Sequence, residues 1–309
     1  MTDRFNWLEF EEEEGGGRPP SGAGRGPDGG KDERWHLAEA ERAFTDGEFE
    51  PALRNYSAAL KYKSDLEEAW AGQARCMAML DQTDLAMKWG QKGLDLLPTS
   101  RLMASAMVTV LARAGHPAAA LELSDQILAR GQDALSHAPW FWLDRGGCLL
   151  ADSQESSAVK CFERAAEMAG NNPDWLQRIG HAYLEGNAPA RALAVLDKVA
   201  EKRSERAFLW ILTSRAAARM NLMERAIQDY EMARALDPIH PALPKTPPRA
   251  AKGANRPCWI ATLVFEDATH PVVERLRGWR NEVWLVTSMG RGAAALYDIT
   301  APLVCRLLT

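Results

Sequence analysis

Small and apolar residues recur along two thirds of the chain with a nearly constant period. The clearest series consists of alanines that stand 34, 34, 38, 34 and 34 residues apart, and we call them the column alanines: Ala52, Ala86, Ala120, Ala158, Ala192 and Ala226. Other, mostly small, residues recur twelve positions before them and seven positions after them. Small side chains at such fixed offsets let two helices approach closely. The pattern therefore predicts a two-helix hairpin that is repeated six times and stacks as a solenoid.

The six predicted hairpins lie within a repeat array over residues 32–238. Their expected ranges are 33–62, 66–96, 100–130, 139–168, 173–201 and 204–236. Turns of the first three are marked by Gly47, by Asp81 and by the stretch from Gly115 to Pro117, because glycine and aspartate favour turns. Four extra residues fall within 131–140, where we expect a longer connection and a change in the pitch of the superhelix.

Large side chains recur at fixed offsets as well. Sixteen residues before a column alanine stand Trp70, Trp142, Leu176 and Trp210, and four residues after one stand Tyr56, Phe162 and Tyr230. Proline closes two hairpins, at Pro98 and Pro238, where a helix must stop. This arrangement resembles the tetratricopeptide repeat, a helix–turn–helix unit of about 34 residues. The resemblance implies an all-α solenoid of about six repeats that acts as a protein-interaction scaffold.

Two segments beside the array are predicted to lack regular structure. Residues 1–31 begin with an aromatic and acidic stretch, residues 5–14, and continue as a Gly/Pro-rich run that cannot bury enough apolar surface to fold. The aromatic stretch is either part of a solvated tail or a short docking peptide that orders on a partner. Residues 239–257 are rich in proline, which favours an extended, semi-rigid linker.

The last segment, residues 258–309, predicts a small helical module. Apolar residues at three- and four-residue steps over residues 272–284 form a helical stripe, with arginines beside it. The segment resembles the CFI-box domain of bacterial proteins at Cys258, Trp259, Ile260, Arg277, Trp279, Arg280, Gly290, Arg291 and Tyr297. Trp259, Asn281 and Ala301 depart from the pattern of that domain. The resemblance implies an attachment or targeting element and assigns no reaction.

Composition narrows the classes of function. A formal net charge of −5 provides no field to hold a polyanion, so we expect no nucleic-acid partner. Five cysteines without framework spacing indicate reduced thiols, and Cys76, Cys148 and Cys161 fall at helical packing positions. The sequence shows neither a secretory signal nor an apolar run of about 18 residues. We therefore expect a cytoplasmic protein without cofactor or metal, for which membrane binding is disfavoured.

The tetratricopeptide resemblance also implies where a partner binds. First helices of the hairpins line a concave groove in that family, which here carries Arg75, Arg113, Trp140, Arg178, His181, Phe208, Arg215 and Arg219. Guanidinium groups bind carboxylates through paired hydrogen bonds, so a protein or peptide partner with acidic groups suits this groove. The other interpretation is a solvated face whose charges pair within the chain. We also hypothesise that the acidic residues 7–14 occupy the groove until a partner displaces them.

Two other functions stay open. Cys258 with His270 as base would make a cysteine-centred enzyme or a site of thiol modification, although no oxyanion loop is evident. The Trp/Arg helix at 271–286 would suit a membrane-surface adaptor. No nucleotide-binding, zinc-protease or serine-hydrolase motif occurs, and Cys258, His270 and Cys305 lack the close spacing of metal ligands. The preferred prediction is a non-enzymatic scaffold.

Overall fold

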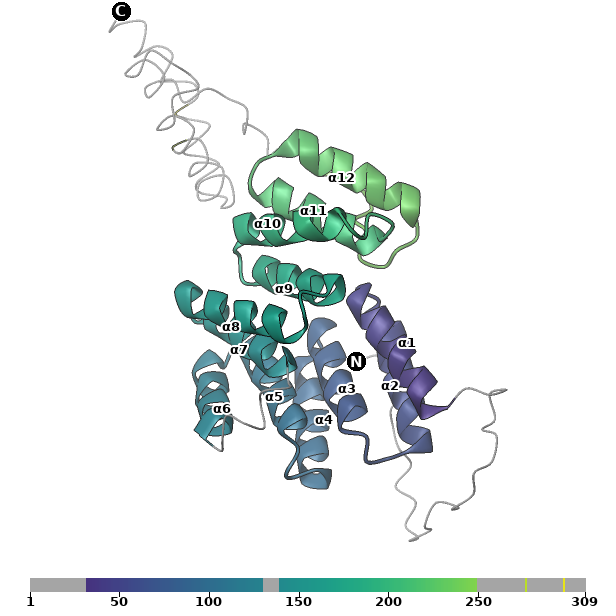
Figure 1. Ribbon diagram of the computed structural model, residues 1–309, viewed down its shortest axis with the longest axis vertical. Helices are drawn as coiled ribbons and strands as arrows, with labels where there is room; N and C mark the ends of the chain where they lie inside the picture. Colours follow the sequence, from purple (N-terminus) through teal and green to yellow (C-terminus); the bar gives the residue numbers. More distant parts are fainter. Residues whose placement is uncertain (1–31, 130–138, 249–275, 277–296, 298–309) are drawn as a thin grey trace, which may run out of the picture. The chain divides into compact units, whose positions relative to one another are not determined.

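The computed structural model describes residues 32–129 and 139–248, together with residues 276 and 297. Within these residues the chain forms twelve helices and no strand. The helices are α1 (Glu33–Thr45), α2 (Phe49–Tyr62), α3 (Glu67–Met79), α4 (Thr83–Leu96), α5 (Arg101–Arg113), α6 (Pro117–Ala129), α7 (Pro139–Ala151), α8 (Glu155–Met168), α9 (Pro173–Glu185), α10 (Pro189–Ala200), α11 (Ala207–Arg219) and α12 (Met223–Leu236). They follow one another as six hairpins, so the predicted all-α repeat fold is confirmed (Figure 1).

Several predicted segments lie outside the described residues. They are the N-terminal residues 1–31, most of the connection at 131–140, the end of the proline-rich linker, and the C-terminal module apart from Leu276 and Tyr297. What the sequence predicts for them stays a prediction.

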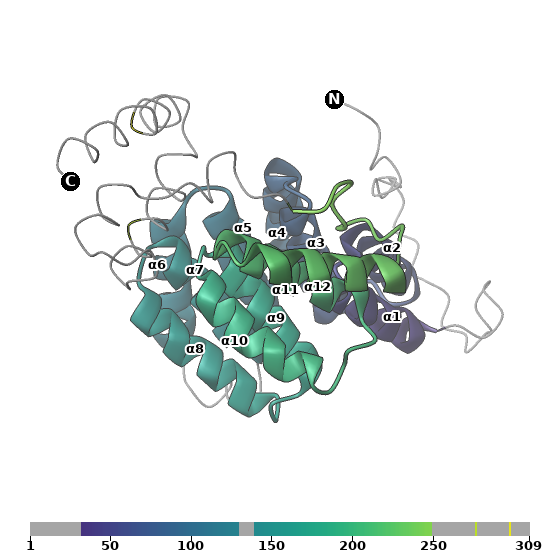
Figure 2. The ribbon, with the colours of Figure 1, turned by 90° about the horizontal axis from the view of Figure 1, so that it is seen from above.

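The chain divides into two compact units, residues 1–182 and residues 183–309, with the division inside α9. In the first unit neighbouring hairpins stack in sequence order, because α3 packs on α2 and α5, and α5 packs on α4 and α7. In the second unit α11 packs on α10 and α12. Figure 1 shows α12 alongside α11, and in Figure 2, which is seen from above, α12 lies over α11. Stacking of this kind buries the apolar side of each hairpin against its neighbours.

Each hairpin turns at one residue whose backbone is left-handed. These residues stand five positions before the column alanines, with φ between 57° and 85°: Gly47, Asp81, Gly115, Ser153, Asn187 and Asn221. In every turn the following backbone N–H donates to the carbonyl five residues earlier, as Gln82 N does to Met77 O at 2.9 Å. This is the Schellman end of a helix, in which a left-handed residue lets the chain reverse and satisfies a terminal carbonyl. The period of about 34 residues in the sequence therefore reflects a backbone turn that recurs once in every hairpin.

The core follows the offsets seen in the sequence. All six column alanines are fully buried. Large rings fill the space that small residues leave, since the Tyr56 ring lies where a side chain on Gly72 would stand, and the Phe162 ring does the same at Gly146. Tyr56 and Phe162 are themselves at most 1% exposed. Paired small and large residues thus allow close helix contacts both within a hairpin, as between α7 and α8, and between neighbouring hairpins, as between α2 and α3.

Candidate functional site: the inner cluster

A buried ion pair links three first helices of the first unit. Arg75 of α3 donates from Nε to Asp144 Oδ1 at 3.2 Å and from Nη2 to Asp144 Oδ2 at 2.5 Å. The two side chains are only 2% and 3% exposed. Ser105 and Thr109 of α5 donate to the same carboxylate, at 2.5 and 2.7 Å. The Asp144 carboxylate of α7 therefore accepts from two neighbouring elements, and its charge is fully compensated.

A second arginine links α9 to α1. Arg178 donates from Nη2 to Glu41 Oε2 at 2.7 Å and from Nε to Thr45 Oγ1 at 3.0 Å. Gln177 donates to the Thr45 carbonyl at 2.6 Å. The Tyr56 hydroxyl donates to the other Glu41 oxygen at 2.7 Å. Burial and the Glu41 carboxylate raise the pKa of Tyr56, so this hydroxyl keeps its proton and stays a donor.

Trp140 lies between the two arginines. Its ring centroid is 4.3 Å from the Arg75 guanidinium carbon and 4.6 Å from that of Arg178, both within the range of cation–π attraction. Phe44 and Trp175 pack edge-on against the same ring, at centroid distances of 5.4 and 5.0 Å. Trp140 is nevertheless only half-buried. It is an aromatic side chain held in place by its neighbours, with part of its surface accessible.

We call this set of contacting side chains the inner cluster. Its members on the first helices of the first unit are Glu41, Thr45, Arg75, Ser105, Thr109, Trp140, Asp144 and Arg178. Two arginines face two carboxylates in it, so the cluster is balanced in charge. The sequence predicts the arginines and Trp140 on one face, and it does not predict the hydroxyl partners or Trp175.

His181 and Arg113 lie beside the inner cluster in the same unit. The His181 ring stacks on Phe49 with centroids 6.0 Å apart. Arg113 donates to the Ala78 carbonyl at 2.7 Å and to Asp81 at 3.0 Å, and its side chain is 23% exposed. Both side chains are half-buried, and each stands one helical turn from a member of the cluster, His181 from Arg178 and Arg113 from Thr109, so we call these two residues and Trp140 its margin.

The three other predicted groove residues belong to the second unit, where they hold the backbone. Arg215 donates to the Ala242 carbonyl at 2.6 Å, and burial lowers its pKa. Arg219 donates to the Leu184 carbonyl. Phe208 is buried and stacks on His240 at 5.6 Å. Arg215 and Phe208 thus contact residues 237–248, which fold back along α11 and α12, whereas Arg219 contacts the end of α9.

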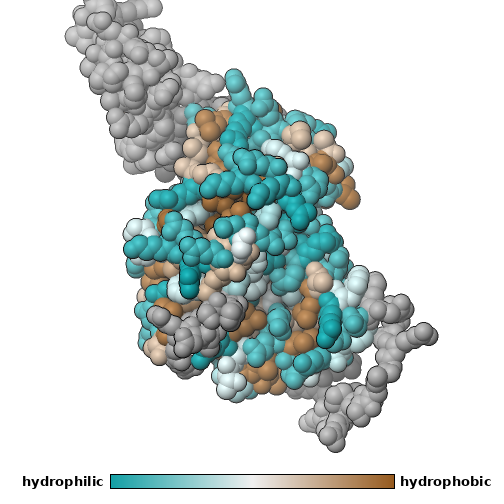
Figure 3. Space-filling model, in the orientation of Figure 1, coloured by the Kyte–Doolittle hydropathy of each residue, from teal (hydrophilic) through white to brown (hydrophobic). Residues whose placement is uncertain are grey.

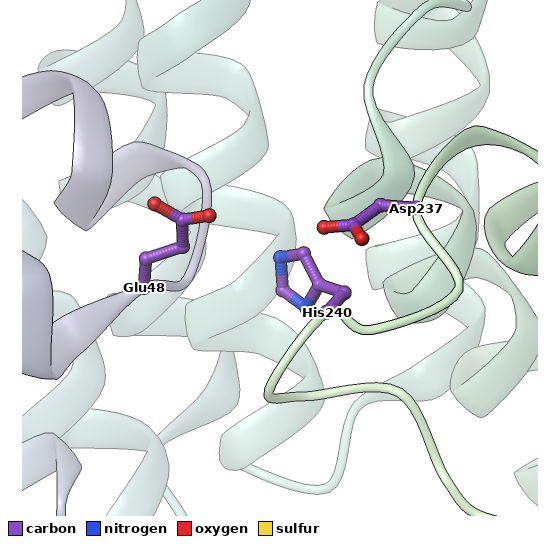
Figure 4. Close-up of side chains that lie close together, drawn as sticks. All are labelled: Glu48, Asp237 and His240. Atoms are coloured by element: carbon purple, nitrogen blue, oxygen red, sulfur yellow. The ribbon is translucent and has the colours of Figure 1, made fainter.

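Figure 4 shows two residues at the start of that segment, Asp237 and His240. The backbone N–H of His240 donates to the Asp237 carbonyl at 3.4 Å, and His240 Nδ1 accepts from Ala242 N at 3.1 Å. The third residue labelled there, Glu48, belongs to the first unit. Whether a partner binds at any predicted groove residue stays a prediction. The motif residues of the C-terminal module, Tyr297 excepted, lie outside the described residues.

The described cysteines are packed in the helices. Cys76 is fully buried, and Cys148 and Cys161 are at most 6% exposed. Burial raises the pKa of Cys76 and Cys161, and it raises the pKa of Cys148 to about 11. A raised pKa leaves very little of the nucleophilic thiolate near neutral pH. These three thiols therefore have the properties of core residues.

Alkylation tests this interpretation of the cysteines. At pH 8 a thiol of pKa about 11 is only about 0.1% thiolate. We expect iodoacetamide to leave Cys76, Cys148 and Cys161 unmodified in the folded chain and to modify all three in 8 M guanidinium chloride, as read by peptide mass spectrometry. Modification of Cys148 in the folded chain at the rate of a free cysteine would contradict the burial described here.

Comparisons with known proteins agree with the helix pairing. Residues 37–101 and 178–241 match the model of the tetratricopeptide repeat. No curated protein matches the chain. Among the described residues, no helix combines the length and the apolarity that crossing a membrane requires.

Solved structures give weaker alignments. One is PilW, a widely conserved type IV pilus biogenesis factor, at 19% identity over 68% of this chain and 96% of that chain, with a TM-score of 0.43. Another is a tetratricopeptide repeat protein from Parabacteroides merdae, at 16% identity over 66% and 78%, with a TM-score of 0.44. A third is a thermophilic protein of this type from Thermus thermophilus, at 19% over 60% and 98%, also with 0.44.

These alignments are too weak to support a family. The presence of tetratricopeptide repeats therefore rests on the match to the repeat model and on the helix pairing. Both matched stretches span complete turns of hairpins whose bounds and period agree with a unit of about 34 residues. On these grounds the chain contains tetratricopeptide repeats.

Proposed function

We propose that the protein is a non-enzymatic scaffold that binds a partner protein or peptide at the margin of the inner cluster. Arrays of this kind bind other proteins on the surfaces that their stacked repeats create. The observation that carries the proposal is Trp140, a half-buried indole fixed between two guanidinium groups. Tryptophan fixed in this way is a typical anchor of protein interfaces, because it offers a large contact area at little cost in conformational entropy.

The sequence predicts that the arginines of the cluster bind acidic groups of a partner. We propose a different role for Arg75 and Arg178. Arg75 and Arg178 already have carboxylate partners, so an acidic peptide would have to displace Asp144 or Glu41 to reach them. Displacing Asp144 would leave its charge or that of Arg75 buried and uncompensated, which is costly, and displacing the 37% exposed Glu41 would leave Arg178, which is 8% exposed, without its carboxylate. We therefore propose Arg75 and Arg178 as positioning residues for Trp140. Contact with the partner is proposed at Trp140, His181 and Arg113, where an apolar or aromatic side chain of the partner would pack.

The C-terminal residues 258–309 complete the proposal as an attachment element. Their support is the sequence pattern alone, since they lie outside the described residues apart from Leu276 and Tyr297. The scaffold would then bind one protein through its repeats and be held to a second body through this module.

Co-purification from cells that make the protein tests this function. We expect the tagged full chain to recover a partner and the Trp140→Ala/His181→Ala variant to recover about tenfold less, as expected for loss of an interface hot spot. The matched control is Lys160→Ala, on the exposed side of α8. Circular dichroism verifies that the variants keep their helices. Equal recovery with all three chains would overturn the proposal for the inner cluster.

A chain that ends at Pro257 tests the attachment element in the same experiment. It should keep the partner that depends on Trp140 and lose a second set of proteins. Loss of the Trp140-dependent partner, or no loss at all, would contradict an attachment role for residues 258–309.

A further inference from the structure

The last hairpin exposes apolar side chains at its turn. Met220, Leu222 and Ile227 are 36%, 43% and 42% exposed, and Met223 beside them is half-buried. They lie at the α11–α12 turn and in the first two turns of α12, where residues 223 and 227 share one side of the helix. We call these four residues the terminal patch. Figure 3 shows brown, apolar surface among teal surface in the part of the molecule that α11 and α12 form.

The position of Leu222 is polar in four of the five other hairpins, and that of Ile227 is apolar in all five and exposed in none. The position of Leu222 holds Glu48, Gln82, His116, Gln154 and Ala188 in the five preceding hairpins. The position of Ile227 holds Leu53, which is fully buried, and Leu193, which is 6% exposed. An internal hairpin is followed by a further hairpin whose first helix packs on its second helix, as α3 packs on α2. The last hairpin has no such successor among the described residues, and no described helix covers the terminal patch.

Part of this end is already capped by residues 237–248. The Tyr230 hydroxyl donates to the Pro244 carbonyl at 3.1 Å, and His240 stacks on Phe208. On the outer side of α12, Glu231 and Arg234 form an exposed pair at 3.9 Å. Their positions correspond to Ser57 and to the buried Leu60 of the first hairpin. The exposed surface of α12 is thus mixed, apolar at Ile227, Met232 and Leu236 and polar at Glu231 and Arg234.

We infer that residues 271–286 of the same chain dock on the terminal patch. These residues carry apolar side chains at helical spacing: Val272, Val273, Leu276, Trp279, Val283 and Trp284. The segment from 258 to 309 has only 52 residues, and a core of that size rarely stabilises itself. Its apolar stripe needs a surface. Leu276, the one described member of the stripe, is 41% exposed.

The chain leaves the array at a suitable place for this contact. Residues 237–248 already fold back along α12 as far as Tyr230, whose hydroxyl donates to the Pro244 carbonyl, and Tyr230 stands three residues, about 4.5 Å along the helix axis, from Ile227. Residues 249–271 connect Pro248 to the stripe, and a few extended residues suffice for a distance of that order. The connection therefore reaches back along α12 without being fully extended.

Charge at the rim agrees with this occupant. Glu224 lies exposed in the first turn of α12, beside the patch. Arg275, Arg277 and Arg280 flank the apolar stripe of residues 271–286. The Glu224 carboxylate offers these arginines one opposite charge, which favours one orientation of docking. This inference does not depend on partner binding at the inner cluster, so either can fail without the other.

Photo-crosslinking in the full chain tests the inference. p-Benzoylphenylalanine replaces Ile227 in one sample and Leu96, an exposed apolar residue at the end of α4, in the control. Equal amounts of chain labelled with ¹⁴N and ¹⁵N are mixed before irradiation, and cross-linked peptides are mapped by mass spectrometry. We expect cross-links from position 227 to residues 271–286, and both peptides of each cross-linked pair should carry the same isotope, because they come from one chain. Position 96 should give no cross-link to that segment.

A substitution in the segment sharpens the test. Trp279→Glu should lower the yield of this cross-link about tenfold, because the burial of one large apolar side chain contributes at least that factor to the docking equilibrium. Trp279→Phe should keep most of the yield, because it keeps a large apolar ring. Mixed-isotope pairs would assign the patch to a second copy of the chain and overturn the inference. Cross-links to any other segment, or none at all, would overturn it as well.

Discussion

Replacing Asp144 by alanine is expected to lower the free energy of unfolding by about 3–5 kcal/mol, the usual cost of leaving a buried charge without its partner. Arg75 would keep its charge at 2% exposure, and the hydroxyls of Ser105 and Thr109 would lose their acceptor. Urea unfolding followed by circular dichroism measures the change. The result matters for function, because the same ion pair fixes one side of Trp140.

Two further variants separate this effect from a general loss of packing. Asp144→Leu combined with Arg75→Met should recover most of the lost stability, since apolar residues of similar volume often replace a buried pair without penalty. Arg42→Ala removes two exposed pairs, with Glu39 and Asp46, and should change stability by less than about 0.5 kcal/mol. A loss below about 1 kcal/mol for Asp144→Ala would show that the pair is not as buried as described.

The second large effect is expected at Gly146. An added Cβ would stand 2.5 Å from a ring carbon of Phe162, which is 1% exposed and cannot move aside without disturbing the core. Gly146→Ala should therefore destabilise the protein by about 1–3 kcal/mol, the typical cost of overpacking. The same urea experiment measures it.

The neighbouring glycine supplies the matched control. A Cβ on Gly147 meets nothing within 4 Å, and the residue lies in the same helix α7. Gly147→Ala should stabilise by up to about 1 kcal/mol through helix propensity. If both substitutions change stability in the same direction and by the same amount, the small–large pairing between α7 and α8 is wrong.

The hairpins could be predicted from the sequence because their cause is local. A left-handed residue five positions before each column alanine reverses the chain, and the alanine itself lies at the closest approach of two helices. Gly47, Asp81 and Gly115 were assigned to turns from their residue type. Ser153, Asn187 and Asn221 hold the same position in the period, and only the period identifies them.

The inner cluster could be predicted only in part, because its partners come from distant hairpins. Arg75 and Asp144 are 69 residues apart, and Arg178 and Glu41 are 137 apart. Which acid meets which arginine depends on the angle between stacked hairpins, and packing rather than residue type sets that angle. One signal was available: Glu41 and Arg75 stand at one offset from their column alanines, and Asp144 and Arg178 at another. The ion pairs, however, join residues at different offsets, Arg75 with Asp144 and Arg178 with Glu41, so the offsets indicate opposite charges on this face and do not identify which of them pair.

Hydrogen exchange of the full chain with and without its purified partner is the most direct test of the scaffold proposal. If the margin of the inner cluster binds the partner, exchange should slow in the peptides of α7 and α9 that contain Trp140 and His181, while the exposed side of α8 exchanges as before. Slowing confined to α8 and the other second helices, with α7 and α9 unchanged, would contradict the proposed site.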